Sequence, residues 1–186
     1  MTPTKACHSR LFINLVSKFE DAEYDGVILD LAEQWCVLAS IEEFNLDGYW
    51  IIRKDTIKQV RHRNYEAFRH QILKADGILA GLRSLEAIDI SITSHLFASL
   101  VRFQNYVIVY RESDTDWWMH HAALAFTNGK QVLMHSFDGA GRFNRTFSRC
   151  KMADITSIRI GSRYLQTYQK AAPYNFMDRR PVSQNL

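Results

Sequence analysis

The sequence predicts an α+β protein made of two similar halves, each a set of short β-strands followed by one helix. Short segments rich in Val, Ile, Leu, Trp and Tyr, separated by polar or Gly-containing breaks, are typical of strands. Two segments also resemble each other: "KDTIKQVRHRNYEAF" at 54–68 and "MADITSIRIGSRYLQTY" at 152–168. Both run from an Asp through Ile-x-x-[Val/Ile]-Arg to a polar break and then a Tyr. We therefore expect an internal duplication.

The first half is expected to contain a meander of strands at 10–19, 25–32, 35–42 and 48–61. The last strand should bend at the polar run Arg53-Lys54-Asp55. Turns are expected at Glu33-Gln34 and at Leu46-Asp47-Gly48, where Gly can supply a positive φ.

A helix should follow this meander. Asn64 is a suitable N-cap residue, because its side-chain oxygen can accept a free N–H of the first turn. Tyr65, Phe68 and Ile72 follow at helical spacing and share one face. Asp76-Gly77 can end the helix.

The second half repeats this order, with strands expected at 106–112, 117–127, 130–137, 145–150 and 153–160. Asn128-Gly129 predicts a hairpin with a type I′ turn. Ser162 can cap a last helix with Tyr164, Leu165 and Tyr168 on its apolar face.

The two halves can be aligned through their bent strands. Aligning Ile57 with Ile155 also aligns Val60 with Ile158 and Arg61 with Arg159. We expect the four apolar residues of this alignment to be buried beside the helix that follows.

The expected units are a first module at 1–76, a connector helix with the second module at 77–172, and a C-terminal tail at 173–186. The connector helix would be capped by Thr93 or Ser94 and would present Leu96, Phe97, Leu100, Val101 and Phe103. The connector is not rich in Gly, Ser or Pro, so we expect the halves to pack closely.

A helix beside a small, strongly bent barrel of about five strands resembles the Sm-like fold. The expected architecture is therefore two tandem Sm-like β-barrel modules, each with a flanking helix. Positions 100–160, with "AALAFTNGKQVLMHSFDGAGRFNRTF", are similar to the WYL domain of bacterial regulators, which is itself Sm-like. The Trp-Tyr-Leu tripeptide of that family falls on Gln131-Val132-Leu133, and no helix-turn-helix precedes it. The resemblance implies a nucleic-acid or nucleotide ligand, held here by Arg142, Arg145 and Arg149.

Composition indicates a globular chain of 186 residues, with 47% apolar and 23% charged residues and a net charge of +3. Cys7, Cys36 and Cys150 are far apart and lack CxxC spacing, which favours reduced thiols and a cytoplasmic protein. The apolar run "LFINLV" is too short for a signal sequence, and no run is long enough to cross a membrane.

Charge is unevenly distributed along the chain. Positions 20–47 hold nine acids and no Lys or Arg, whereas 53–74 hold seven Lys or Arg and two acids. The first stretch predicts an acidic rim for a protein partner, with the candidates Glu20, Asp21, Glu23, Asp25, Glu42 and Glu43. The basic stretches predict an anion or nucleic-acid site, with the candidates Arg53, Arg61, Arg63, Arg142, Arg145 and Arg149. The charged faces could instead complement each other within the molecule.

We therefore expect a non-enzymatic binding protein, most simply a protein-interaction or inhibitor and immunity-type module, with no catalytic residues, metal or cofactor. The alternative is a nucleic-acid or nucleotide binder with an Sm-like or WYL-like fold. A hydrolase that uses His and Cys of the second half is the third possibility, although the sequence contains no GxGxxG, P-loop or HExxH motif. The sequence leaves the oligomeric state open, since two fused modules could replace a homodimer or form half of a ring.

Overall fold

The computed structural model describes residues 1–19, 22–104, 106–113 and 117–173, and in them the chain is an α+β protein. The strands of the first half are β1 (Phe12–Ser17), β2 (Glu23–Leu31), β3 (Trp35–Glu42), β4 (Asn45–Arg53) and β5 (Ile57–Arg61). Those of the second half are β6 (Tyr106–Glu112), β7 (Trp117–Thr127), β8 (Gln131–Ser136), β9 (Ser148–Lys151) and β10 (Ser157–Ile160). The helices are α1 (Pro3–His8), α2 (Asn64–Ala75), α3 (Ile78–Gly81), α4 (Thr93–Phe103) and α5 (Arg163–Ala171), with 3₁₀ turns η1 (Lys54–Thr56) and η2 (Met152–Asp154).

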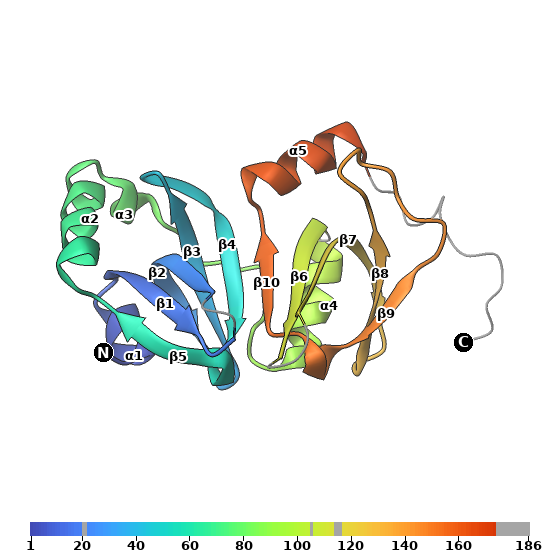
Figure 1. Cartoon of the computed structure of the whole chain (residues 1–186), viewed down its shortest axis with the longest axis horizontal. Helices are drawn as coiled ribbons and strands as arrows, with labels where there is room; N and C mark the ends of the chain where they lie inside the picture. The colour runs from blue at the N-terminus through green and yellow to red at the C-terminus, as the bar shows by residue number, and fades with distance from the viewer. Residues whose placement is uncertain (20–21, 105, 114–116, 174–186) are drawn as a thin grey trace.

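The described strands form one ten-stranded antiparallel sheet in the order β5-β1-β2-β3-β4-β10-β6-β7-β8-β9 (Figure 1). Within each half, four strands form a meander and the last strand pairs back with the first, as β5 with β1 and β10 with β6. The halves are joined by β4 and β10, where Trp50 lies opposite Arg159. The two halves therefore share one strand order and lie head to tail in the sheet.

The expectation of two small β-barrels is corrected by this pairing. To close a barrel in the first half, β4 would have to pair with β5, but β4 pairs with β10 instead. In the second half, β9 is an edge of the sheet. The sheet is strongly bent but not closed into a barrel.

The expected bent strand at 48–61 is in fact two strands, β4 and β5, joined by a 3₁₀ turn, and in the second half a 3₁₀ turn likewise joins β9 to β10. The Lys54 N–H donates to the Gln34 carbonyl at 2.8 Å, and the Met152 N–H donates to the Lys130 carbonyl at 3.0 Å. The turns η1 and η2 thus occupy equivalent places, each anchored to the start of the third strand of its half. Of the apolar residues aligned through these turns, Val60, Ile155 and Ile158 are buried, and Ile57 is partly buried.

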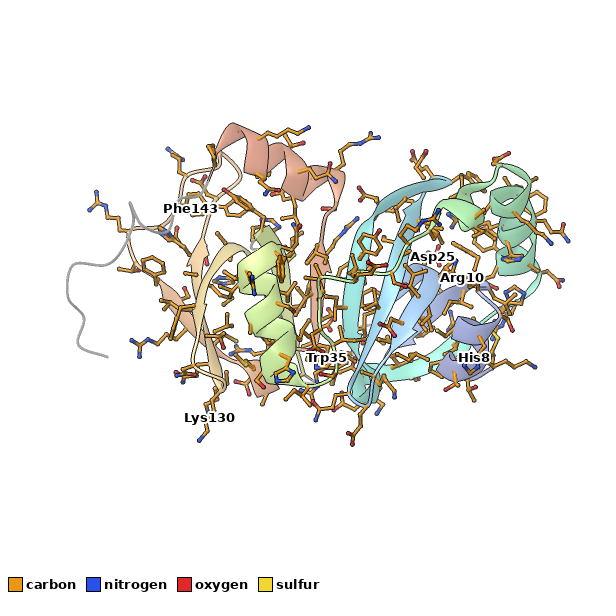
Figure 2. All side chains as sticks on the ribbon, turned by 180° about the vertical axis from the view of Figure 1, so that it is seen from behind. His8, Arg10, Asp25, Trp35, Lys130 and Phe143 are labelled. Atoms are coloured by element: carbon orange, nitrogen blue, oxygen red, sulfur yellow. The ribbon has the colours of Figure 1, made fainter. Side chains whose placement is uncertain are left out.

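The largest core cluster spans the junction between the halves. Leu96, Phe97 and Leu100 of α4 pack there with Trp35 of β3 and Val107 of β6. Figure 2 shows α4 in front of the second half. The connector therefore joins the halves by burying apolar side chains from both.

Several local expectations are corrected. The tight turn between β3 and β4 is Glu43-Phe44, and Leu46-Asp47-Gly48 lies inside β4. The N-cap residue of α2 is Arg63, one residue before the expected Asn64. In the β7–β8 hairpin only Gly129 has a positive φ, so the turn is not type I′.

The buried face of α2 also differs from the expected one. Tyr65 and Phe68 are 62% and 61% exposed, and the helix buries Glu66, Arg69 and Leu73 instead. Leu73 packs in a cluster under α2 and α3, whereas Arg69 reaches over the sheet. The helix therefore presents aromatic side chains to the solvent.

Candidate protein-binding site

Four of the six acids predicted for the acidic rim line one cavity of about 470 Å³ in the first half. These acids are Glu23, Asp25, Glu42 and Glu43. The other two, Glu20 and Asp21, lie outside the described residues. The structure thus gathers the described part of the predicted rim around one hollow, which we call the acidic cavity.

Strand geometry places the carboxylates. Glu23 and Asp25 are two positions apart on β2, so their side chains leave the same face of the sheet. The Asn14 side-chain amide on β1 donates to both, at 3.2 Å to Glu23 and 3.0 Å to Asp25. Glu42 ends β3, and Glu43 lies in the adjoining turn. One amide therefore holds two carboxylates side by side.

Two arginines reach the cavity from other elements. The Arg69 guanidinium of α2 donates to Asp25 at 2.9 Å and to the Ile41 carbonyl at 3.3 Å. Arg159 of β10 forms ion pairs with Glu42 and Asp47. Among the residues that line the cavity, four carboxylates stand against two guanidinium groups, so two negative charges are in excess.

The site contains polar atoms that lack hydrogen-bond partners. Asn14 Oδ1, Arg69 Nε and Arg159 Nε are buried and have no hydrogen-bond partner among the residues that the structure describes. Asn14 and Arg69 are 6% and 7% exposed. A buried polar group left unpaired costs about 1–3 kcal/mol. An incompletely paired network in a hollow of the surface indicates a site arranged for more than stability.

Aromatic side chains form another wall of the cavity. Tyr24 and Trp50 pack edge to face with ring centroids 4.8 Å apart. The Arg159 guanidinium carbon lies 5.3 Å from the centre of the Trp50 ring. Aromatic faces attract cations, so this wall together with the carboxylates favours a basic group.

The six predicted anion-site arginines do not form one surface. Arg61 is on β5 and Arg149 on β9, which are the opposite edges of the sheet. Arg53, near the junction, pairs with Asp55 at 2.5 Å. The remaining partners are Glu23 for Arg61 at 2.6 Å and Asp138 for Arg142 at 3.0 Å.

Arg63 and Arg145 are exposed on separate segments. Basic and acidic stretches also pair within the molecule: Arg61 with Glu23 and Arg69 with Asp25 in the first half. Arg159, which is not among the six predicted residues, extends this pairing across the halves. Its ion pairs with Glu42 and Asp47 link the second half to the first.

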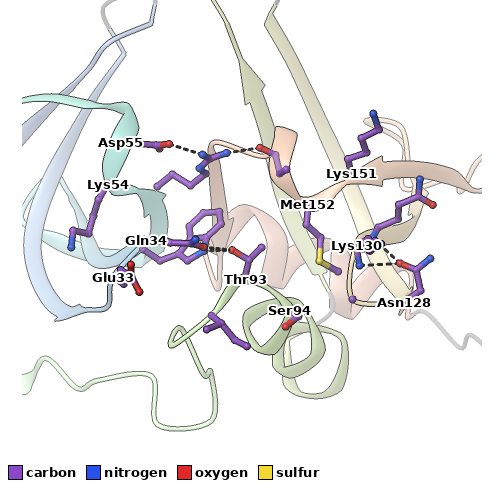
Figure 3. Close-up of a pocket in the computed structure, with 16 residues that line it drawn as sticks. Glu33, Gln34, Lys54, Asp55, Thr93, Ser94, Asn128, Lys130, Lys151 and Met152 are labelled. Carbon is purple, nitrogen blue, oxygen red and sulfur yellow. Dashed lines mark hydrogen bonds and ion pairs between the residues drawn. The ribbon is translucent and has the colours of Figure 1, made fainter.

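A larger cavity, of about 1060 Å³, lies at the junction of the halves (Figure 3). At its wall the Trp35 indole N–H donates to the Thr93 hydroxyl at 2.9 Å, and that hydroxyl donates to Gln34 at 2.7 Å. Charged residues of both signs line it: Glu33, Arg53, Lys54, Asp55, Lys130 and Lys151. The sequence did not indicate this cavity, because its lining comes from five separate stretches of the chain.

The thiols are poorly suited to nucleophilic chemistry. Burial raises the pKa of the Cys36 thiol to about 12, and burial also raises the pKa of Cys150. Because the thiolate is the reactive form, both residues are unreactive at neutral pH. Within the described ranges, no group of three or more His, Cys, Asp or Glu residues has a metal-binding arrangement. In the same part of the chain, no helix is long and apolar enough to cross a membrane.

The residues that complete the acidic cavity could not be found from the sequence. Asn14 is one polar residue in the apolar run "FINLVS", and Arg69 lies in a helix whose aromatic residues predicted a different buried face. A polar residue in the middle of an apolar strand is the one signal that could have indicated Asn14.

No protein-family model, no curated protein and no solved structure matches this chain.

Proposed function

We propose that the protein is a binding module, without catalytic activity, that receives a basic side chain of a protein partner in its acidic cavity. The observation that carries this proposal is the convergence of Glu23, Asp25, Glu42 and Glu43 on one hollow. An inhibitor or immunity-type role, in which the chain covers a basic surface of its target, fits such a site.

Electrostatics supports a basic partner. The lining has two negative charges in excess, and a surface with an excess of one sign of charge attracts the opposite charge. Glu43 has no ion pair among the described residues, and the Glu42 side chain in the pair with Arg159 is 56% exposed. Both carboxylates therefore remain accessible to an incoming ammonium or guanidinium group.

Phosphate binding has less support. Its six candidate arginines are spread from one edge of the sheet to the other, and Arg53, Arg61 and Arg142 are already paired with carboxylates. A nucleic-acid site usually needs a continuous basic stripe along the phosphate backbone.

The test uses a synthetic peptide of alternating Arg and Ser, the Arg–Ser peptide, with binding followed by calorimetry. Replacing both Glu42 and Glu43 by Gln should weaken binding by about tenfold, which corresponds to roughly 1.4 kcal/mol. The matched control is Asp30→Asn with Glu33→Gln, which removes the same charge from exposed acids outside the acidic cavity. The control should bind like the wild type.

Two results would overturn the proposal. If the control pair weakens binding as much as the cavity pair, the attraction is a general effect of net charge. The second result has two parts: the wild type binds single-stranded RNA but not the Arg–Ser peptide, and Arg145→Glu with Arg149→Glu abolishes the RNA binding. The nucleic-acid alternative would then replace the proposal of a basic protein partner.

We also propose that the two halves are Sm-like modules that arose by duplication, the second with a WYL-like character. The shared strand order, the equivalent turns η1 and η2 and the helix that follows each last strand support this. A cytoplasmic location is proposed because Cys7, Cys36 and Cys150 are all free thiols, which suits a reducing compartment.

A further inference from the structure

An exposed aromatic surface lies beside the acidic cavity. It consists of Phe44 in the β3–β4 turn and of Tyr65 and Phe68 on α2, which are 37%, 62% and 61% exposed. We call these three residues the aromatic patch. Folding does not bury them, since α2 packs through Leu73 and through Arg69, whose guanidinium lies over the Phe12 ring.

Arg69 makes the patch continuous with the cavity. Its guanidinium carbon lies 5.2 Å from the Phe44 ring centre and 5.6 Å from that of Tyr65. The same guanidinium donates to the Tyr65 hydroxyl at 3.3 Å and to Asp25 at 2.9 Å. One buried arginine therefore lines the acidic cavity and supports two rings of the patch.

The turn that presents Phe44 has a left-handed backbone. Glu43 and Phe44 have φ values of 46° and 63°, in the left-handed region, and neither is a glycine. The Asn45 side chain donates to the Glu43 carbonyl at 2.9 Å and helps to hold the turn. A two-residue hairpin loop takes this conformation at both positions, and it directs the Phe44 ring to the surface beside Arg69.

We propose that the partner carries a basic segment with interspersed apolar residues, whose basic side chain enters the acidic cavity while an apolar side chain packs on the aromatic patch. This inference rests on the proposed function and specifies its partner. Aromatic residues are enriched in the buried centres of protein interfaces, where they supply large contact areas. Carboxylates beside the patch complement a basic partner and would repel a second copy of this same acidic surface.

The experiment compares the Arg–Ser peptide with a peptide of alternating Arg and Leu, the Arg–Leu peptide. The wild type should bind the Arg–Leu peptide about tenfold more tightly, a difference of roughly 1.4 kcal/mol. Phe68→Ser, which leaves Phe44 and Tyr65 in contact with Arg69, should remove most of this gain and leave the affinity for the Arg–Ser peptide unchanged. The matched control is Phe103→Ser, which removes an aromatic residue of 53% exposure outside the first half and should keep the gain.

The outcomes separate the two proposals. If the Arg–Ser peptide binds but leucine adds nothing, or the gain survives in the patch variant, the patch proposal is wrong and the cavity proposal stands. If the Arg–Ser peptide does not bind, the cavity proposal is wrong. If ultracentrifugation shows self-association that the patch variant abolishes, a second copy occupies the patch and the proposal is overturned. Thermal unfolding of each variant verifies that it is folded.

Discussion

At the scale of single residues, Gly48 shows how closely the two halves approach each other. Its φ is +77°, and a Cβ atom there would lie 2.3 Å from the Ile160 carbonyl oxygen. That oxygen belongs to β10, so the contact lies at the seam between the halves. A side chain at this position would have to push two paired strands apart.

Gly48→Ala should therefore destabilise the protein by more than the backbone conformation alone explains. Gly77 is the matched control, because its φ is +73° and nothing lies within 4 Å of an added Cβ. Gly77→Ala should cost about 1–2 kcal/mol for the left-handed conformation. Gly48→Ala should cost roughly 1–3 kcal/mol beyond that for overpacking. Urea unfolding of both variants measures the difference between their free energies of unfolding. Equal losses of stability would contradict the prediction, because the contact between Gly48 and β10 would then accommodate a methyl group.

Gly48 and the acids of the cavity also show how much of a residue's role can be predicted from the sequence. Local sequence rules read Gly48 as a turn residue, whereas its role comes from Ile160, more than a hundred positions away. The acidic rim could be predicted because its residues are concentrated in one stretch of the chain. Asn14 and Arg69 could not, because their roles depend on side-chain hydrogen bonds across strands and from a helix.

At the scale of elements, most strands follow from the sequence, and the bounds of β3 agree with the expected 35–42. Strand propensity and polar breaks are local properties, so they indicate where strands begin and end. The buried face of α2 is not a local property. Its aromatic spacing predicted a face with Tyr65 and Phe68, but the sheet beneath offers contacts to Arg69 and Leu73.

Two substitutions in α2 distinguish these faces. Leu73 is fully buried, so Leu73→Ala should lower the free energy of unfolding by about 2–5 kcal/mol through the cavity it leaves. Phe68→Ala, on the exposed face, should change it by no more than about 0.5 kcal/mol. Chemical denaturation of both variants measures this. A large loss at Phe68 with a small one at Leu73 would restore the face that the sequence predicted.

At the scale of the whole molecule, the repeated strand order raises the question of self-association. The β4–β10 pairing joins the fourth strand of one half to the last strand of the other. The two edges of the sheet are β9, the fourth strand of the second half, and β5, the last strand of the first half. Each edge thus corresponds to one of the two strands that pair at the junction. Two copies could in principle pair end to end. The pairing of β4 with β10 was not indicated by the sequence, because no local pattern shows which strands meet.

The charges on these edges oppose such pairing, and we expect the protein to be monomeric. At the seam, the Arg53 N–H donates to the Thr156 carbonyl at 2.9 Å. The residues equivalent to Arg53 and Thr156 at the two edges are Lys151 and Lys58, which are both exposed. Like charges directly opposite each other destabilise strand pairs, and lysines on edge strands are a known protection against aggregation. Analytical ultracentrifugation of the wild type should give the mass of one chain. Lys58→Glu places opposite charges across the two edges, so this variant should associate at low salt and dissociate as salt is added. Wild-type assembly that Lys58→Glu weakens would contradict this argument, because the basic edges would then be attracting a partner copy.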